Sequence, residues 1–305
     1  MPTENSIAGV YVAAITPRRE EGCEADIGAM LELVDFLCSA GVDGIALLGS
    51  TGEFVHFSFS DRNRLIEMAV KRSRVPILAG TSHSTLAGTI ELSQAAMAAG
   101  AAGLLVMPPY FFRYGQQEIR EFYLQLAAAM GKQARIFLYN IPFFTSEIEI
   151  ETAMELLSTG LFAGIKDSSG NYEHAERFCA LAQQHPFTML AGNDRIFTAA
   201  RQAGAHGIVS GVACAAPELL VALDRAIKNQ QAEEILRLDA RLQEFIDWHE
   251  RFPTPVAIKA ATAVRGLKTG PFSTPLDAAG DARLEEFRQW FKSWLAAVQN
   301  EAAHA

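Results

Sequence analysis

The segment Phe162-Ala163-Gly164-Ile165-Lys166-Asp167-Ser168-Ser169-Gly170 carries a lysine at the end of a short apolar run, directly before a polar loop that a glycine closes. This pattern is typical of a buried strand that delivers its last side chains to the end of a sheet. A strongly hydrated ammonium is rarely placed where water is scarce. Two interpretations of Lys166 follow. It forms a Schiff base, because desolvation favours the neutral amine that attacks a carbonyl, or it reaches water or pairs with Asp167.

On both sides of this segment, short β-rich runs alternate with longer stretches of helical periodicity. Residues 26–40, for example, have apolar residues at helical spacing and stop before Gly41. Eight strand-then-helix units in about 225 residues predict an α/β protein with a (β/α)₈ TIM barrel. A doubly wound sheet would need a dinucleotide fingerprint after the first strand, and Thr16-Pro17-Arg18 is not one. The predicted strands are 10–15, 44–48, 75–79, 103–107, 135–139, the run that ends at Lys166, 188–191 and 207–210.

The pattern changes near residue 230, after which only helices are expected, at 232–248, 255–266 and 282–299. We therefore predict a barrel at residues 1–229 and a C-terminal helical extension at residues 230–305. The extension would pack on the barrel or on a neighbouring subunit.

Composition excludes several classes of partner. A formal net charge of -9 argues against a general surface for nucleic acid or for an anionic membrane, since both need a basic face. Met1 to Ser6 show no basic-then-apolar signal, and no apolar run approaches the length of a membrane span. The four cysteines (Cys23, Cys38, Cys179 and Cys214) are far apart and predict reduced thiols. We expect a cytoplasmic protein.

Active sites of this fold are built from the loops at the C-terminal ends of the strands. The loop Gly49-Ser50-Thr51-Gly52 could turn hydroxyls and N–H groups toward a carboxylate or phosphate, or be an ordinary turn. Tyr139 ends an apolar run, so its hydroxyl could relay protons, or it could be a core tyrosine bonded to a carbonyl. His83 has no other ligand-type residues in a metal-binding pattern, so we predict no metal site.

Four segments follow one another along the chain: Gly49-Ser50-Thr51-Gly52-Glu53, Tyr139-Asn140-Ile141-Pro142, the lysine segment quoted above and Gly192-Asn193-Asp194. In this order and at these intervals, they together resemble the dihydrodipicolinate synthase / N-acetylneuraminate lyase family. The resemblance covers roughly residues 10–217 and, more loosely, a tail segment at 255–259. It implies a class I lyase, free of metal and cofactor, that handles pyruvate or another 2-keto acid with an aldehyde and assembles as a homotetramer, a dimer of dimers.

The resemblance also implies roles for individual residues. Lys166 would form the Schiff base with the keto carbon, and Tyr139 would move the proton as a C–C bond forms or breaks. Ser50 and Thr51 would hold the pyruvate carboxylate, with backbone help near Val209. The residues expected to contact substrate are Ser50, Thr51, Ser168, Gly192, Asp194, Val209 and Phe144.

Three positions depart from the family pattern and bear on the second substrate. Phe111 stands where the lysine-biosynthesis synthases carry a tyrosine that reaches a neighbouring subunit's site. Phe144 stands where they carry an arginine for the carboxylate of aspartate semialdehyde, and a phenylalanine cannot pair with a carboxylate. Arg195 follows Asp194 where sialate lyases tend to have an acidic residue.

These departures favour an aldolase or a dehydratase that acts on a 2-keto-3-deoxy (sugar) acid to give pyruvate and an aldehyde. The first alternative is a dihydrodipicolinate synthase (4-hydroxy-tetrahydrodipicolinate synthase) that condenses pyruvate with aspartate semialdehyde. A non-catalytic, pyruvate-binding regulatory protein and a phosphate-binding barrel isomerase or synthase are weaker alternatives.

Overall fold

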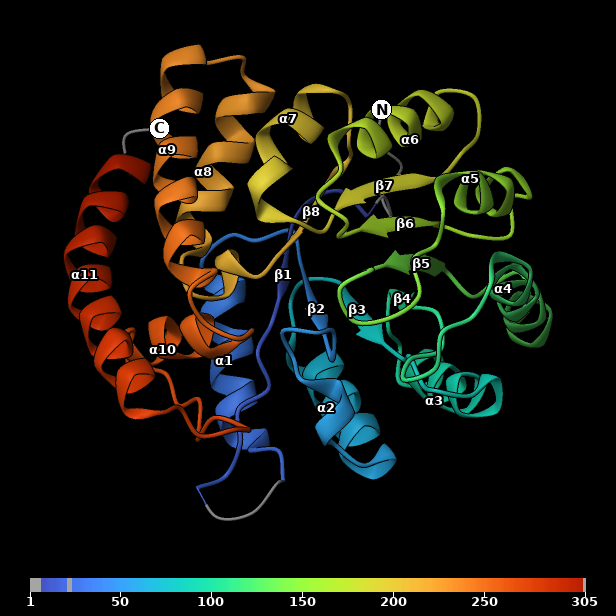
Figure 1. Ribbon diagram of the computed structural model, residues 1–305, viewed down its shortest axis with the longest axis horizontal. Helices are drawn as coiled ribbons and strands as arrows, with labels where there is room; N and C mark the ends of the chain where they lie inside the picture. Colours follow the sequence, from blue (N-terminus) through green and yellow to red (C-terminus); the bar gives the residue numbers. More distant parts are fainter. Residues whose placement is uncertain (1–6, 21–23, 304–305) are drawn as a thin grey trace.

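Eight short parallel strands close into a barrel in the computed structural model, which describes residues 7–20 and 24–303 (Figure 1). Strand β1 pairs with both β2 and β8, so every strand has two neighbours and no sheet edge is open. The predicted (β/α)₈ barrel is thereby confirmed. The strands are β1 (Gly9–Ala13), β2 (Gly44–Leu47), β3 (Ile77–Gly80), β4 (Gly103–Val106), β5 (Ile136–Asn140), β6 (Gly164–Asp167), β7 (Thr188–Ala191) and β8 (Gly207–Ser210).

A helix follows each strand and covers the outside of the barrel (Figure 1). Because helices cover one face of the sheet and packed side chains fill the other, the strands are buried almost throughout. Short 3₁₀ turns η1 (Phe54–His56), η2 (Asp194–Ile196) and η3 (Val212–Cys214) interrupt three of the loops at the C-terminal rim. The helices are α1 (Ile27–Ser39), α2 (Phe59–Arg72), α3 (Leu86–Ala98), α4 (Gln116–Met130), α5 (Ile150–Ser158), α6 (Tyr172–Ala182), α7 (Phe197–Gln202) and α8 (Pro217–Lys228).

Three further helices form the C-terminal extension: α9 (Ala232–His249), α10 (Val256–Val264) and α11 (Ala278–Ala302). The long α11 runs along α9 and α10 at the side of the barrel (Figure 1). Aromatic rings join them; Phe245 of α9 lies 5.5 Å from Trp294 of α11, between ring centres. Such rings bury large apolar areas, so the extension has a core of its own. The boundary at residues 229/230 stays a prediction.

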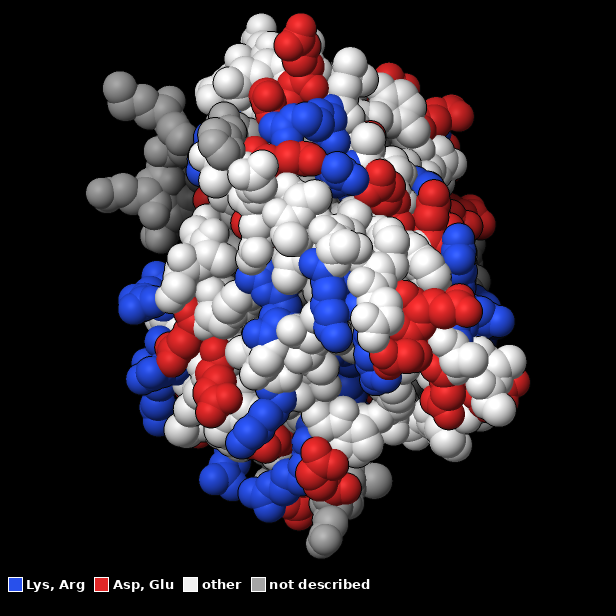
Figure 2. All heavy atoms as spheres, turned by 90° about the vertical axis from the view of Figure 1, so that its left-hand side faces the viewer, with Lys and Arg blue, Asp and Glu red and all other residues white. Residues whose placement is uncertain are grey.

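The face that carries α11 shows basic and acidic side chains interspersed with uncharged ones (Figure 2). Ion pairs join the helices of the extension, for example Arg241 of α9 with Glu301 of α11 at 2.8 Å. Within the described ranges, no helix combines the length and apolar character that crossing a bilayer requires. Cys38, Cys179 and Cys214 are free thiols, and Cys23 lies outside the described residues.

Candidate active site

Lys166 and Tyr139 are direct neighbours across the β5–β6 ladder. Because side chains alternate along a strand, both face the barrel interior, while the next pair, Asn140 and Asp167, faces the other way. The Lys166 side chain ends 4.0 Å from the centre of the Tyr139 ring, measured from Nζ. Lys166 is only 3 % exposed, so its side chain is almost fully withdrawn from bulk water.

The neighbouring Asp167 does not form an ion pair with Lys166. Asn140 Nδ2 donates to Asp167 Oδ1 at 2.8 Å, and Ser169 Oγ donates to Oδ2 at 2.7 Å. These donors satisfy the buried carboxylate. The geometry therefore disfavours the interpretation of Lys166 as a surface lysine or as the partner of Asp167.

The loop after β2 brings Ser50 to the phenol of Tyr139. Their oxygens lie 3.1 Å apart, within hydrogen-bond distance. The loop is a tight turn, in which the Glu53 N–H donates to the Ser50 carbonyl at 3.0 Å. Thr51 is buried beside it. A connected pair of hydroxyls next to an amine can pass a proton between substrate and protein.

Gly192, directly after β7, allows two site residues to pack closely. Ser168 Oγ donates to the Gly192 carbonyl at 3.0 Å. A Cβ on Gly192 would lie 2.1 Å from Ser168 Oγ and 2.9 Å from Lys166 Cε, which is closer than carbon atoms pack. Glycine at this position therefore keeps the amine and the hydroxyl in place.

Asp194 is held at the rim by the loop after β8. Its carboxylate accepts hydrogen bonds from Ser210 Oγ and, at 3.2 Å, from the Gly211 N–H. Burial raises the pKa of Asp194 to about 6, although these hydrogen bonds act in the opposite direction. The side chain is therefore able to exchange a proton near neutral pH.

Arg195 turns away from Asp194 and toward the C-terminal extension. Its guanidinium donates to Glu250 at 2.8 Å and to Asp247 at 3.0 Å, both in or just after α9. Two carboxylates thus neutralise this cation. It is not free to bind an anionic substrate group.

One cavity of about 630 Å³ at the C-terminal rim brings together all the site residues that the sequence predicts. The sequence reasoning missed the part of the wall that the C-terminal extension supplies. Helical periodicity indicates which face of a helix is buried but not what it covers, so no signal could have located these residues. The predicted residues are Lys166, Tyr139, Ser50, Thr51, Ser168, Gly192, Asp194, Val209 and Phe144, and the missed ones are Ile246, His249, Glu250, Phe252, Thr254 and Ile258.

Two exposed phenylalanines, Phe143 and Phe144, lie on the outer side of this cavity. Phe144 also borders a neighbouring cavity of about 390 Å³, together with Ser50 and Phe111. Phe111 is 87 % exposed and has a φ of 83°, a left-handed conformation that is costly for a bulky residue. The wall of the site therefore has apolar rings at Phe143 and Phe144, beside polar side chains from the loop after β7 and from the C-terminal extension.

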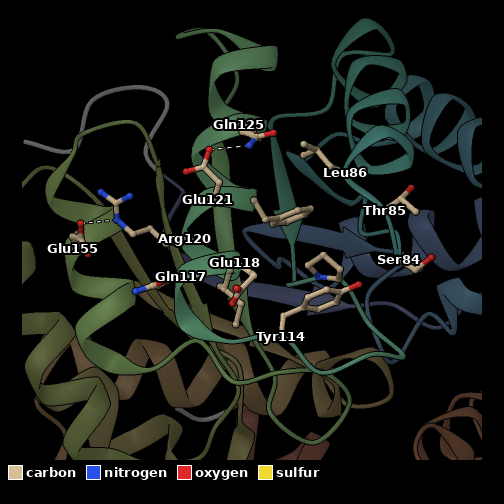
Figure 3. Close-up of a pocket in the computed structure, with 13 residues that line it drawn as sticks. Ser84, Thr85, Leu86, Tyr114, Gln117, Glu118, Arg120, Glu121, Gln125 and Glu155 are labelled. Carbon is tan, nitrogen blue, oxygen red and sulfur yellow. Dashed lines mark hydrogen bonds and ion pairs between the residues drawn. The ribbon is translucent and has the colours of Figure 1, made fainter.

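A third cavity, of about 1010 Å³, lies outside the barrel between the start of α3 and α4 (Figure 3). It contains none of the predicted site residues. Arg120 pairs with Glu155 at 2.7 Å, and Gln125 donates to Glu121 at 2.8 Å (Figure 3). Because these polar groups bond to one another, we assign no chemistry to this cavity.

His83 has local partners. Its Nδ1 lies 3.0 Å from Thr85 Oγ1, and its ring packs edge-on against Phe59. In the part of the chain that the structure describes, no three His, Cys, Asp or Glu side chains are grouped so that they could hold a metal ion.

Comparisons with known proteins agree on the family. The model of the dihydrodipicolinate synthetase family matches residues 6–293. The 4-hydroxy-tetrahydrodipicolinate synthase of Nitrosomonas eutropha is 32% identical over 287 residues, covering 92% of this chain and 96% of the relative. Two solved structures are similar.

The first is the 4-hydroxy-tetrahydrodipicolinate synthase of Methylacidiphilum fumariolicum SolV, with a TM-score of 0.87, 26% identity and coverage of 97% of this chain and 99% of that one. The second is YagE, a prophage protein of the same family from E. coli K12 in complex with pyruvate, with a TM-score of 0.85 and 28% identity, covering 94% and 99%. The matches span the barrel and most of the helical extension.

Proposed function

The chain belongs to the dihydrodipicolinate synthetase family and is a pyruvate-dependent lyase, and on this premise we propose that Lys166 forms the Schiff base with the substrate's keto carbon. The observation that carries the proposal is the burial of the Lys166 amine at the cavity, beside the Tyr139 ring and without an ion pair to Asp167. A lysine desolvated in this way is suited to nucleophilic attack.

The proposed reaction begins with attack of the Lys166 nitrogen on the keto carbon of pyruvate or of a longer 2-keto acid. Water leaves and an imine forms. In the cleavage direction, Tyr139 accepts the proton of the hydroxyl next to the bond that breaks, which releases an aldehyde and leaves an enamine. A proton is then returned to the enamine carbon, and water hydrolyses the imine to free pyruvate. Ser50, 3.1 Å from the phenol, is placed to pass the proton on.

We propose that the aldehyde is neutral. In the cleavage direction it is the product released, together with pyruvate, from a 2-keto-3-deoxy acid. Phe144 lies in the cavity wall where the resemblance predicts an arginine in the synthases. Arg195, the nearby cation, is neutralised by α9 carboxylates. Asp194 and Ser168 offer groups for substrate hydroxyls. Cleavage of a C–C bond and dehydration use the same enamine, so the proposal includes an aldolase and a dehydratase.

The second candidate is 4-hydroxy-tetrahydrodipicolinate synthase activity on pyruvate and aspartate semialdehyde. The names of the relatives support this candidate better than the first, since they are synthases of this kind. Phe111 and Phe144 are the residues that count against it.

The test is to trap the Schiff base. The protein is incubated with pyruvate and borohydride, and the modified peptide is mapped by mass; we expect reduction onto Lys166 and no labelling of a Lys166→Met variant. An unmodified Lys166 would overturn the proposal and would leave a non-catalytic binder as the better account.

Product formation from a panel of aldehydes with pyruvate then identifies the second substrate. Efficient turnover of aspartate semialdehyde would select the second candidate. Unchanged activity after exhaustive chelation is expected for a metal-independent lyase, and light scattering tests the proposed tetramer, because a mass near 33.2 kDa would contradict it.

A further inference from the structure

Lys259, in α10, is a second buried lysine, and the proposed reaction does not use it. It is 1 % exposed and is the only charged residue of α10, whose other residues are apolar except Thr262. Its Nζ donates to the Pro271 carbonyl at 2.8 Å and to Glu53 Oε2 at 3.3 Å. A lysine is almost never fully buried unless it is paired, so these contacts require an explanation.

Glu53, the partner of Lys259, ends the loop that carries Ser50 and Thr51. Its other oxygen lies 3.6 Å from Arg18 and 3.5 Å from His56. The side chains of Arg18 and Glu53 are 6% and 4% exposed. Breaking a buried ion pair by removing one partner is far more costly than breaking an exposed one, because it strands a charge. The cluster therefore ties the loop firmly to α10.

The loop needs such restraint because its backbone is unfavourable on both sides of the two hydroxyl residues. Leu48 has a φ of 57° and Glu53 a φ of 51°, both in the left-handed region that non-glycine residues avoid. Residues in such conformations persist only where surrounding contacts over-determine them. Thr16 Oγ1 contributes one contact by donating to the Gly52 carbonyl at 2.7 Å. The Lys259–Glu53 pair supplies a second one, from the other end of the chain.

Helix α10 also reaches the cavity itself. Ile258, next to Lys259, lines the cavity, and a Cβ added to Gly211 would lie 2.9 Å from its Cδ1. The segment after α10 packs on the other side of the cluster, where the Arg18 N–H donates to the Thr269 carbonyl at 3.2 Å. The extension therefore contacts the rim of the barrel at the point where the loop after β2 needs support.

We propose that Lys259 is a positioning residue for pyruvate binding: through Glu53 it holds the loop that presents Ser50 and Thr51 to the pyruvate carboxylate. This inference rests on the proposed function, because it concerns the carboxylate end of the same substrate. The C-terminal extension thereby contributes to substrate binding, together with the loops of the barrel.

The test uses Lys259→Met, which removes the charge and keeps a long apolar side chain. The readout is the pyruvate concentration at which borohydride traps half of the maximal fraction of protein on Lys166 in a fixed reaction time. It is measured at a temperature where each variant is folded. We expect this concentration to rise about tenfold, a loss of about 1.4 kcal/mol in pyruvate binding. The maximal trapped fraction should stay complete, because the amine is untouched. Lys268→Met, at an exposed lysine in the same segment, is the matched control and should leave the concentration unchanged.

Glu53→Gln provides a second, nearly isosteric disruption if Lys259→Met does not fold. It should raise the half-maximal concentration at least as much, because Glu53 also contacts Arg18 and His56. The double variant should lose less than the sum of the two single losses, because both variants break the same Lys259–Glu53 contact. A lower melting temperature with an unchanged half-maximal concentration would show a purely structural role and overturn the inference. Failure of the unsubstituted protein to be trapped at all would instead refute the proposed function, and the inference with it.

Discussion

Replacing Gly192 by alanine should misplace the reactive amine without changing its chemistry. The new Cβ would lie 2.1 Å from Ser168 Oγ and 2.9 Å from Lys166 Cε, whereas ordinary contacts begin at 3.4 Å. The hydroxyl must therefore move by about 1.3 Å and the lysine carbon by about 0.5 Å. Ser168 can rotate, at the cost of its hydrogen bond to Gly192. Lys166 is buried and fixed at its strand, so it cannot avoid the contact freely.

Misplacement of a reacting group by about 1 Å costs on the order of 100-fold in rate. We expect the rate of pyruvate-dependent trapping on Lys166 to fall between about 10- and 100-fold in Gly192→Ala. The control is Gly28→Ala in α1, where the nearest atom to an added Cβ is 3.4 Å away. A trapping rate within about threefold of the unsubstituted protein, in a folded Gly192→Ala variant, would refute this reasoning.

Three further predictions concern single residues of the site. Tyr139→Phe should lower the rate of C–C bond cleavage by about 10²- to 10⁴-fold, measured as aldehyde release, while trapping on Lys166 persists; an unchanged rate would exclude Tyr139 as the proton carrier. The pKa of Asp194 is raised from 3.8 to about 6 on folding, so the folded state holds the protonated carboxyl more tightly than the unfolded state does. This contribution of Asp194 to the free energy of unfolding is fully present below about pH 4 and is lost as the pH rises through 6. The melting temperature of the unsubstituted protein relative to Asp194→Asn should therefore fall between about pH 4 and pH 7, and a constant difference would contradict the shift. Phe144→Arg should raise kcat/KM for aspartate semialdehyde about tenfold by supplying a cation for its carboxylate, and no gain would show that another feature limits this substrate.

The sequence predicted the barrel because its evidence is local and repeated. Each strand is a short apolar run, and each helix shows its own periodicity, so eight units indicate a closed barrel without knowledge of any long-range contact. The strand ends were less certain. The first strand is predicted at 10–15 and runs from Gly9 to Ala13, although Ala14 still donates a backbone hydrogen bond to Ala46 of β2 at 3.0 Å and Ile15 is buried.

The position of the site also followed from the sequence. Parallel strands end at one rim, so residues at or just after the strand ends, such as Ser50, Lys166 and Asp194, are expected to lie together, and one cavity contains them. Their catalytic roles stay predictions. The residue types and their positions suggest a Schiff-base lysine, a proton relay and an anion site, and the resemblance specifies the substrate atoms on which each would act.

The tertiary structure alone decided which distant groups meet at that rim. Arg195 follows Asp194 in the chain, yet its charge is bound by Glu250, far along the chain. Lys259 lies in the helix that the sequence predicts at 255–266, and nothing in that pattern indicates that it pairs with Glu53 across 206 positions of sequence. The periodicity of a helix indicates that a side chain is buried. Which residue that side chain contacts depends on how the whole chain packs. The amino-acid sequence by itself determined the barrel and the place of Lys166 in it, while the shape and charge of the outer pocket depended on the packing of the C-terminal extension.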